Sequence, residues 1–372
     1  MGTKKNGLEL YLHIPFCIKK CDYCDFLSGP STRAGQGAYI YALLREMEAV
    51  SKNLKKRPVD TVFIGGGTPS VPECDVMEKL LQGLRDYFLF SADAEVTIEA
   101  NPGTLTPEKL SIYRKYGINR ISIGLQSPKN KELAILGRIH NYAQFLESFQ
   151  MAREAGFSNI NVDLMFAIPG QCYEGWIENL RMVAALGPEH ISAYSLIIEE
   201  GTPFYDMDLN LPNEIQDREM YHFAQDFLKE KGFHQYEISN FAKEGKESVH
   251  NNVYWIRGDY KGFGLGASSL VNNHRLKNTE NMNDYIAGTY VVEDEELTKE
   301  DIYSEFMFLG LRRNEGINVK SFKKLYGDDI YDIYGEAINT HISDGLLEKC
   351  GDNIRLTRKG LDLANTVFVD FV

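Results

Sequence analysis

The sequence lacks the segments that place a protein in or across a membrane. No apolar run approaches the roughly 20 residues that a membrane-spanning helix needs. The first residues, MGTKKNGLELYLHI, lack the long apolar core of a secretion signal. We therefore expect a cytoplasmic protein, and the sequence leaves peripheral contact with a membrane open.

Positive charge is also scarce. The chain has 40 Lys and Arg residues against 53 Asp and Glu residues, which gives a formal net charge of −13. Broad binding to nucleic acid needs a surface rich in Lys and Arg that displaces the phosphate counterions. The balance of charges therefore predicts no nucleic-acid partner.

Cysteine is infrequent, with 6 residues in a chain of 372. A chain of this length buries a large core and needs no disulfides to stabilise it. In the reducing cytoplasm, clustered cysteines are typical of metal ligands rather than of disulfides. Internal repeats and low-complexity segments are absent too, so the composition is that of an ordinary globular protein.

The first two-thirds of the chain alternates short apolar runs with segments of helical apolar spacing, such as AYIYALLREMEAV and IENLRMVAAL. Runs that are apolar on both faces and alternate with helices predict a parallel sheet covered by helices, an α/β fold. Six such units form either a partial (β/α)6 barrel or a doubly wound sheet, and in both folds ligands bind at the carboxyl ends of the strands. The expected strands cover residues 8–14, 60–66, 94–100, 118–125, 159–166 and 189–196.

The pattern changes after residue 204. We expect a helix over 213–231, then irregular, aromatic and Asn/Gly-rich sequence to about residue 290, and a charged link over 292–299. The tail predicts three helices, a two-stranded wing that turns at residues 351–353, and a final helix, which is typical of a small winged-helix module. Because the tail lacks a strong basic face, we expect it to pack or to bind a partner rather than DNA. The expected parts are an α/β core over 1–204, an elaboration over 205–294, and a mostly helical, winged-helix-like domain over 295–372.

The main chemical signal is a cluster of three cysteines. Cys17, Cys21 and Cys24 are separated by three and then two residues, directly after the first expected strand. Such short spacings let one loop place its sulfurs around one face of an iron–sulfur cluster, and three thiolates on a four-iron cluster leave one iron open. A chance grouping at a turn and a partial zinc site are the alternatives. Zinc needs a fourth ligand, and nearby His13 lies on the expected strand.

The cysteine spacing CxxxCxxC after a first strand, followed by the glycine triplet of GGGTPS after the second, resembles the radical SAM superfamily. The likeness runs from LYLHIPFC through the tail, and it is strongest to the coproporphyrinogen III dehydrogenase-like group, which includes heme chaperones. It implies a partial, TIM-barrel-like (β/α)6 barrel that holds a [4Fe–4S] cluster at Cys17, Cys21 and Cys24, with S-adenosylmethionine (SAM) against the open iron. Electron transfer from such a cluster cleaves SAM into methionine and a 5′-deoxyadenosyl radical.

The resemblance also assigns residues to SAM. Glycines after the second strand let the backbone approach the methionine end closely, although a glycine triplet alone also fits a tight turn. Arg138 suits a carboxylate, whereas a Glu, a Gln or an Asp suits ammonium or hydroxyl groups. Singly, each of these residues fits a structural role as well. The implied SAM residues are Tyr11, Tyr23, Gly66, Gly67, Thr68, Glu99, Gln126, Arg138 and Asp163.

Two departures from the dehydrogenase pattern favour a carrier over that enzyme. The dehydrogenase signature continues as CxxxCxxCxC, but here Cys24 is followed by Asp25 and Phe26. The dehydrogenase also has an N-terminal extension, whereas this chain reaches its first expected strand at Leu8. A further feature also favours the carrier. HNNVYW matches the HNxxYW signature of the heme chaperones, which implies a heme role for His250. Residue types alone fit a buried His–Trp cluster there, although imidazole is a common axial ligand of heme iron.

We therefore expect a heme chaperone with a [4Fe–4S] cluster, SAM and heme as its ligands. Its expected partners are an acceptor hemoprotein, with respiratory and membrane-bound acceptors among the candidates, and an electron donor such as flavodoxin or ferredoxin. The alternative is an oxygen-independent coproporphyrinogen III dehydrogenase or another radical SAM oxidoreductase. A radical SAM tRNA modifier is disfavoured because no basic RNA-binding module is visible. The sequence assigns no catalytic residue and leaves a monomer and a dimer open.

Overall fold

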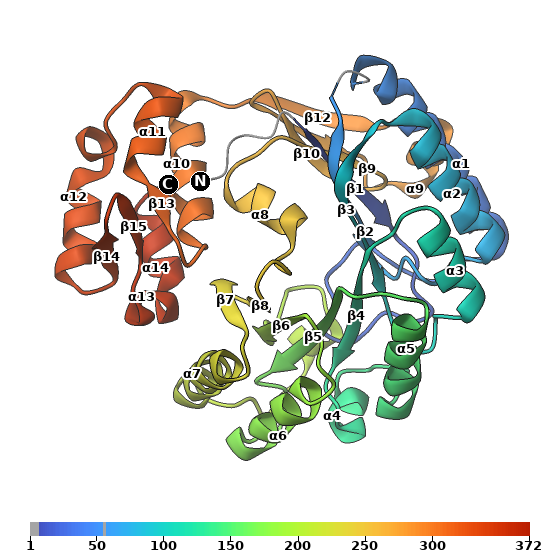
Figure 1. Cartoon of the computed structure of the whole chain (residues 1–372), viewed down its shortest axis with the longest axis horizontal. Coiled ribbons are helices and arrows are strands. Elements are labelled where there is room, and N and C mark those ends of the chain that lie inside the picture. Colours follow the sequence, from blue (N-terminus) through green and yellow to red (C-terminus); the bar gives the residue numbers. More distant parts are fainter. Residues whose placement is uncertain (1–6, 55–56) are drawn as a thin grey trace.

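The structure is a computed structural model that describes residues 7–54 and 57–372. Figure 1 shows a large α/β part, in which a curved sheet is covered by helices, and a smaller helical part beside it. Among the described residues, no helix combines the length and the apolar character that crossing a membrane requires.

A sheet of 12 strands organises the larger part, in the order β12-β11-β10-β9-β1-β2-β3-β4-β5-β6-β8-β7. Its centre consists of six consecutive parallel strands, as the sequence predicts. In the described part of the chain, β12 and β7 are the two ends of the sheet, so the barrel is open and the predicted partial (β/α)6 barrel is confirmed. These central strands are β1 (Leu8–Ile14), β2 (Val59–Gly66), β3 (Phe90–Ala100), β4 (Arg120–Gln126), β5 (Ile160–Phe166) and β6 (His190–Ser195).

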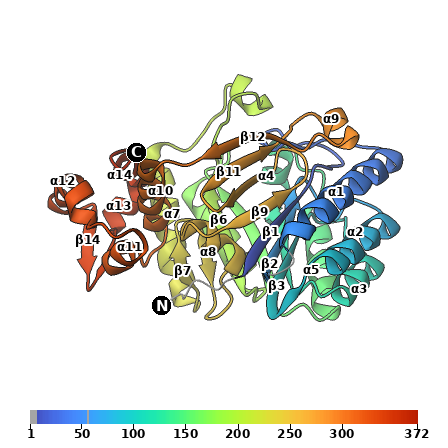
Figure 2. The same ribbon diagram turned by 90° about the horizontal axis from the view of Figure 1, so that it is seen from above.

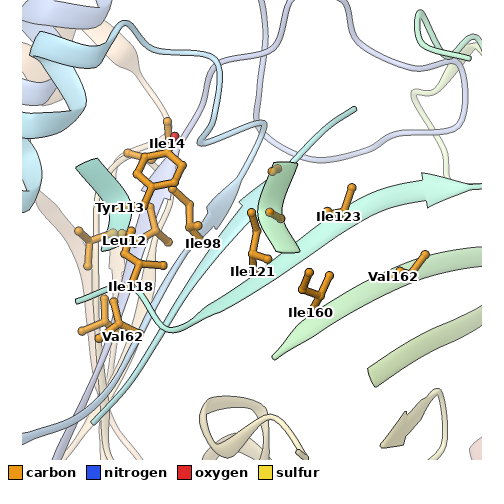
Figure 3. Packing of buried hydrophobic residues seen from close by; sticks show 14 of the residues in the cluster. Leu12, Ile14, Val62, Ile98, Tyr113, Ile118, Ile121, Ile123, Ile160 and Val162 are labelled. Atoms are coloured by element: carbon orange, nitrogen blue, oxygen red, sulfur yellow. The ribbon is translucent and has the colours of Figure 1, made fainter. Parts of the chain in front are cut away.

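The central strands form because they are apolar on both faces and are therefore buried on both. Figure 3 shows side chains such as Leu12, Val62 and Ile121 packed along the sheet, and each of these three is 0% exposed. Thr106 accepts a hydrogen bond from the backbone N–H of Lys109, which caps a helix that begins at Pro107. The helices that connect and cover the strands are α1 (Arg33–Leu54), α2 (Cys74–Tyr87), α3 (Pro107–Lys115), α4 (Asn130–Ile135), α5 (Tyr142–Glu154) and α6 (Tyr173–Ala184).

The segment after residue 204 is more regular than the sequence predicts. The expected helix is present as α7, but the expectation of irregular structure to about residue 290 is wrong. β7 and β8 extend one end of the sheet beyond β6, and β9 to β12 extend the other end beyond β1. The elements are η1 (Pro203–Asp206), α7 (Glu214–Glu230), β7 (His234–Glu237), β8 (Asn240–Ala242), α8 (Val249–Trp255), β9 (Tyr260–Phe263), β10 (Ser268–Val271), β11 (His274–Asn278), α9 (Met282–Ala287) and β12 (Val291–Glu296).

The charged link is also a strand, which corrects another expectation. β12 pairs antiparallel with β11, and every residue of β12 is exposed. Because all of its side chains are exposed, β12 carries no alternating apolar pattern that would predict a strand. Its acidic side chains discourage pairing of this edge with another chain. Figure 2 shows β12 leading from the sheet toward α10 in the smaller part.

The smaller part has its own hydrophobic core, with Met307 and Phe322 among its fully buried side chains. The predicted helices and wing are present, and a short third strand joins the wing in the order β13-β15-β14. The predicted boundary at residue 294 falls within β12, and the division into three domains stays a prediction. The elements are α10 (Lys299–Leu311), β13 (Ile317–Asn318), α11 (Val319–Tyr326), α12 (Ile330–Ser343), β14 (Leu347–Cys350), β15 (Asn353–Leu356), α13 (Arg358–Asp362) and α14 (Ala364–Val369).

Candidate functional site

The three cysteines lie on the loop between β1 and α1, at the carboxyl end of β1. The base of this loop is closed by a backbone hydrogen bond from Cys17 N–H to the Gly29 carbonyl, at 2.9 Å. Within the loop, Cys24 N–H donates to the Cys21 carbonyl at 3.2 Å. All three thiols are half-buried and none forms a disulfide. They are therefore reduced and partly accessible, as ligands of a cluster must be.

The thiols face polar groups from two other loops. Cys17 Sγ lies 3.5 Å from Thr68 Oγ1, and the Arg138 guanidinium donates to Cys21 Sγ at 3.6 Å. Burial raises the pKa of the Cys24 thiol, and charge on Cys21 and Cys17 raises it further, against a backbone hydrogen bond from Phe26. Thiolates that disfavour one another in this way are stabilised together by a positively charged iron–sulfide core.

The described residues include no group of three or more His, Cys, Asp or Glu side chains that closes as around a single metal ion. Cys17, Cys21 and Cys24 supply three thiolates, one ligand fewer than a structural zinc site needs, and three thiolates on a four-iron cluster leave one iron open. Their role as cluster ligands stays a proposal.

The glycine turn after β2 packs directly against the cysteine loop. Gly66 has a φ of +111°, and a Cβ at that position would lie 2.6 Å from the His13 ring. A Cβ on Gly67 would lie 2.8 Å from the Phe16 carbonyl oxygen. The backbone N–H of Thr68 donates to that same carbonyl at 2.7 Å. Only glycine allows this close approach, which leaves backbone rather than side chain beside the cysteines.

Two half-buried carboxyls lie next to the glycine turn. Glu99 Oε2 accepts a hydrogen bond from Gly66 N–H at 3.1 Å. Burial and the nearby Asp163 raise the pKa of Glu99 to about 8, against the hydrogen bond from Gly66. Asp163 accepts from Asn161 Nδ2 at 2.6 Å and from Ser122 Oγ at 3.1 Å, and burial raises its pKa as well. Both carboxyls are poised to accept a cationic or hydroxyl-bearing ligand.

A chain of hydrogen bonds connects two of the cysteines from behind. Arg138 Nη2 donates to Asn101 Oδ1 at 2.6 Å, and Asn101 Nδ2 donates to Thr68 Oγ1 at 2.7 Å. Since Arg138 contacts Cys21 and Thr68 contacts Cys17, Asn101 links the two side chains that contact these cysteines. Asn101 is not among the residues predicted from the sequence, although it stands two residues after Glu99 in the segment TIEANPGTL. Its position so close to Glu99 was the feature of the sequence that could have identified Asn101 as a site residue.

Gln126 carries an unsatisfied polar atom at the end of β4. Its φ is +69°, in a region that non-glycine residues rarely adopt, and its Oε1 is buried without a hydrogen-bond partner among the described residues. Beside it, a Cβ on Gly124 would lie 2.8 Å from Asn101 Oδ1 and 3.4 Å from Arg138 Nη2. A buried acceptor without a partner is rare and is satisfied when a ligand hydroxyl or ammonium donates to it.

The two tyrosines of the predicted set flank this region. Tyr23 packs against Phe204 with ring centroids 6.5 Å apart, and burial raises its pKa despite the nearby Arg138. Tyr11 OH lies 3.0 Å from His13 Nδ1. Burial raises the Tyr11 pKa, and the charge of Glu99 adds to that effect. The structure thus brings together the cysteine loop, the glycine turn and the predicted SAM residues, whose individual roles stay proposals.

His250 lies outside this group, on α8. Its side chain is 1% exposed, with Nδ1 2.6 Å from Thr61 Oγ1 and Nε2 2.8 Å from Tyr254 OH. Its backbone N–H donates to Glu95 Oε1 at 3.0 Å, which fixes the start of α8 to β3. Burial, with the charge of Arg120, lowers the pKa of His250 to about 3, so the ring is neutral. A heme role for His250 stays a prediction, and in this structure both ring nitrogens have partners.

Comparisons with known proteins agree with this geometry. Residues 11–183 match the family model of the radical SAM superfamily, and residues 297–363 match the model of the HemN C-terminal domain. The chain is 37% identical to the heme chaperone HemW of Bacillus subtilis (strain 168), over 97% of this chain and 98% of that protein. It is 34% identical to the heme chaperone HemW of Escherichia coli (strain K12), over 100% of this chain and 99% of that protein.

Among solved structures, the coproporphyrinogen III oxidase HemN of Escherichia coli superposes with a TM-score of 0.88 at 24% identity. The match covers 98% of this chain and 90% of that one, and it shows the same fold. The identity to full-length HemW proteins is higher and spans both parts of the molecule. This chain belongs to the HemW family within the radical SAM superfamily.

Proposed function

We propose that this protein is a heme chaperone, which binds heme and passes it to an acceptor hemoprotein while its barrel holds a [4Fe–4S] cluster and SAM. The observation that carries the proposal is identity of 37% to a curated heme chaperone along essentially the whole chain. Coproporphyrinogen III dehydrogenation is less well supported. The solved HemN structure is only 24% identical, and Asp25 and Phe26 follow Cys24 where that enzyme's signature has a further cysteine.

Cys17, Cys21 and Cys24 would hold the cluster. When bound, the cluster supplies an open iron for SAM and the electron that cleaves it. The chain contributes hydrogen bonds to the sulfurs. Arg138 donates to Cys21 Sγ, and Thr68 Oγ1 lies beside Cys17 Sγ. Donors to a thiolate reduce its charge and thereby raise the reduction potential of the metal group it ligates.

Around the open iron, the chain would bind SAM through both backbone and side chains. Gly66 and Gly67 let the turn pack closely on His13 and Phe16, and their backbone would face the methionine end. Gln126 Oε1 is buried without a hydrogen-bond partner among the described residues. Because its pKa is about 8, the Glu99 carboxyl is protonated near neutral pH until a cation approaches it. A positive ligand beside Glu99 lowers its pKa and is paired with the carboxylate that forms. These features support SAM binding independently of the resemblance.

The remaining partners belong to the same proposal. Lys19 and Lys20 are exposed between Cys17 and Cys21, where they would attract an acidic electron donor such as a flavodoxin or a ferredoxin. The acceptor would be a hemoprotein, with respiratory, membrane-bound ones first to test. That acceptor fits a cytoplasmic protein with peripheral contact to the membrane. The working unit is a monomer or a dimer.

The experiment uses the full chain, reconstituted anaerobically with iron and sulfide. Iron, sulfide and heme are quantified, and the heme-loaded protein is then mixed with an apo-hemoprotein whose absorbance reports transfer. We expect one cluster per chain, bound heme, and heme transfer to the acceptor. Conversion of coproporphyrinogen III, with 5′-deoxyadenosine formed in proportion to turnover, would instead establish the dehydrogenase.

A further inference from the structure

A cavity of about 480 Å³ lies between the open barrel and the smaller part of the molecule. Its wall includes Tyr254 and Trp255 from α8, Leu270 from β10, and Phe308 and Leu309 from α10. Figure 1 shows α8 between the sheet and the smaller part. Cavities of about 300–1,000 Å³ with aromatic and aliphatic walls and few polar groups are typical of sites for small organic ligands and cofactors.

The cavity has an ion pair on one side. Two charged side chains, Arg275 and Glu305, are among the described residues that line it. Glu305 pairs with both Arg275 and Arg257, the latter at 2.8 Å from Nε to Oε2. One carboxylate is thus shared by two guanidiniums, and the Asp301 carboxylate also interacts with Arg275. Arg275 is the more exposed of the two, so it is the one able to turn toward a carboxylate on a ligand.

The hydrogen-bond pattern behind the cavity defines the tautomer of His250. The Thr61 hydroxyl donates to the Glu9 carboxylate, so its oxygen accepts from His250 Nδ1–H. With the ring proton on Nδ1, Nε2 is an acceptor, and Tyr254 OH donates to it at 2.8 Å. His250 is therefore the proton acceptor for Tyr254.

The order of the two residues from the cavity is also clear. Tyr254 lines the cavity and meets Tyr260 edge-on, with ring centroids 4.6 Å apart. The His250 ring lies behind Tyr254, stacked on Phe63 at 5.3 Å. A ligand in the cavity meets Tyr254, while His250 remains covered.

We propose that heme binds in this cavity, with the Tyr254 oxygen as the ligand of its ferric iron, His250 as the residue that positions Tyr254, and Arg275 as the contact for a heme propionate. The proposal rests on the heme-chaperone function and deepens it. Tyrosinate is an established axial ligand of heme iron. Burial raises the pKa of Tyr254, so the phenol stays protonated until iron takes its oxygen.

The ligation step balances without a change of oxidation state. The iron–oxygen bond forms as the O–H bond of Tyr254 breaks, and the proton passes to His250 Nε2. The Nδ1 proton of His250 can move on to Thr61, whose own proton moves to Glu9. Iron remains ferric, and the only species displaced is a solvent ligand of the free heme.

The first test titrates the cluster-loaded full chain with ferric heme and records its absorbance and resonance Raman spectra. We expect the tyrosinate-to-iron charge-transfer signature in the native protein. Tyr254→Phe should lose this signature and bind heme at least tenfold more weakly. Tyr221→Phe is the matched control, because it removes the hydroxyl of another buried tyrosine, which donates to the Ile238 carbonyl at 2.8 Å. The control should leave the spectrum and the affinity unchanged.

His250→Gln separates positioning from direct ligation. If His250 acts through Tyr254, this variant keeps the tyrosinate signature and shifts its frequency. If His250 is itself the ligand, the native protein shows an imidazole spectrum that this variant loses and Tyr254→Phe keeps, and the proposal is overturned. Cluster iron content and circular dichroism verify that each variant is folded.

The propionate contact is tested with heme and heme dimethyl ester, which lacks free carboxylates. The native protein should bind heme at least tenfold more tightly than the ester, and Arg275→Gln should remove most of that preference. Arg358→Gln, which breaks an exposed pair with Asp226 far along the chain, should retain it. An unchanged preference in Arg275→Gln overturns this contact. If the native protein binds no heme at all, the proposed function fails. If it binds and transfers heme while Tyr254→Phe behaves as native, the function stands and only this inference fails.

Discussion

The Glu99 carboxyl accepts a hydrogen bond from the backbone N–H of Gly66 at 3.1 Å, and so joins the end of β3 to the glycine turn that follows β2. The same turn packs on the cysteine loop through Thr68 and Phe16. A half-buried carboxyl of raised pKa is therefore hydrogen-bonded directly to the backbone at the candidate cluster site.

The first prediction concerns the pH dependence of stability. Because the folded-state pKa of Glu99 is about 8, above its ordinary value, the folded chain holds a proton there that the unfolded chain releases at lower pH. The contribution of Glu99 to stability is therefore greatest at acidic pH and is lost as pH rises through about 8. Glu99→Gln should remove this loss, which is on the order of a few kcal/mol. Urea unfolding of the ligand-free native and variant proteins at pH 5.5 and 8.5 measures it. Identical pH dependence in the two proteins would contradict the assignment.

The second prediction concerns the cluster. Cys17→Ser, Cys21→Ser and Cys24→Ser should each abolish the brown absorbance and most of the iron and sulfide, while circular dichroism shows an intact barrel. The fold survives because the cysteine loop lies outside the sheet. Cys172→Ser, which changes an exposed cysteine, is the control and should bind a full cluster. Full cluster iron in Cys21→Ser would refute the ligand set.

The third prediction concerns the glycine turn. Gly66→Ala places a Cβ 2.6 Å from the His13 ring at a φ of +111°. Gly170→Ala is matched in its positive φ of +74° but meets nothing within 4 Å. Both substitutions strain the backbone, and the clash at Gly66 should add about 1–3 kcal/mol of destabilisation. Chemical denaturation compares the two variants, and an equal loss in both would show that the turn adapts to the added carbon.

The fourth prediction concerns the buried His250. Its folded-state pKa is about 3, below its ordinary value, so the unfolded chain takes up a proton there that the folded chain does not. The stability that depends on neutral His250 is present above about pH 6.5 and is lost as pH falls toward 3. Between pH 7.5 and 5, the native chain should lose about 2 kcal/mol more than His250→Gln. Calorimetric unfolding at both pH values measures the difference. A larger loss of stability at acidic pH in His250→Gln than in the native chain would show that a group other than His250 takes up the proton.

The sequence was sufficient for the six central strands, because segments such as LELYLHI are apolar on both faces and leave no other place for that surface. It was not sufficient for β9 to β12. β11 has the sequence HRLKN and β12 the sequence VVEDEE, and these strands are held by pairing with neighbours rather than by an apolar pattern of their own.

The candidate site, like the fold, could be predicted from the sequence only in part. Cysteine spacing and the glycine triplet are local, so the cluster loop and its turn can be read from adjacent residues. The partners of His250 cannot, because Thr61 and Glu95 come from β2 and β3, more than 150 residues earlier in the chain. Asn101 was missed for a related reason. Its importance lies in two contacts, to Arg138 and Thr68, that only the folded barrel creates.

One strand, β3, carries both Glu95 and Glu99, and side chains four positions apart on a strand share a face. Glu95 anchors the backbone at the start of α8, and Glu99 anchors the glycine turn. Helix α8, beside the large cavity, and the glycine turn, beside the cysteines, are thus both hydrogen-bonded to β3. A single strand therefore supplies a hydrogen-bond acceptor both to the helix beside the large cavity and to the turn beside the cysteines.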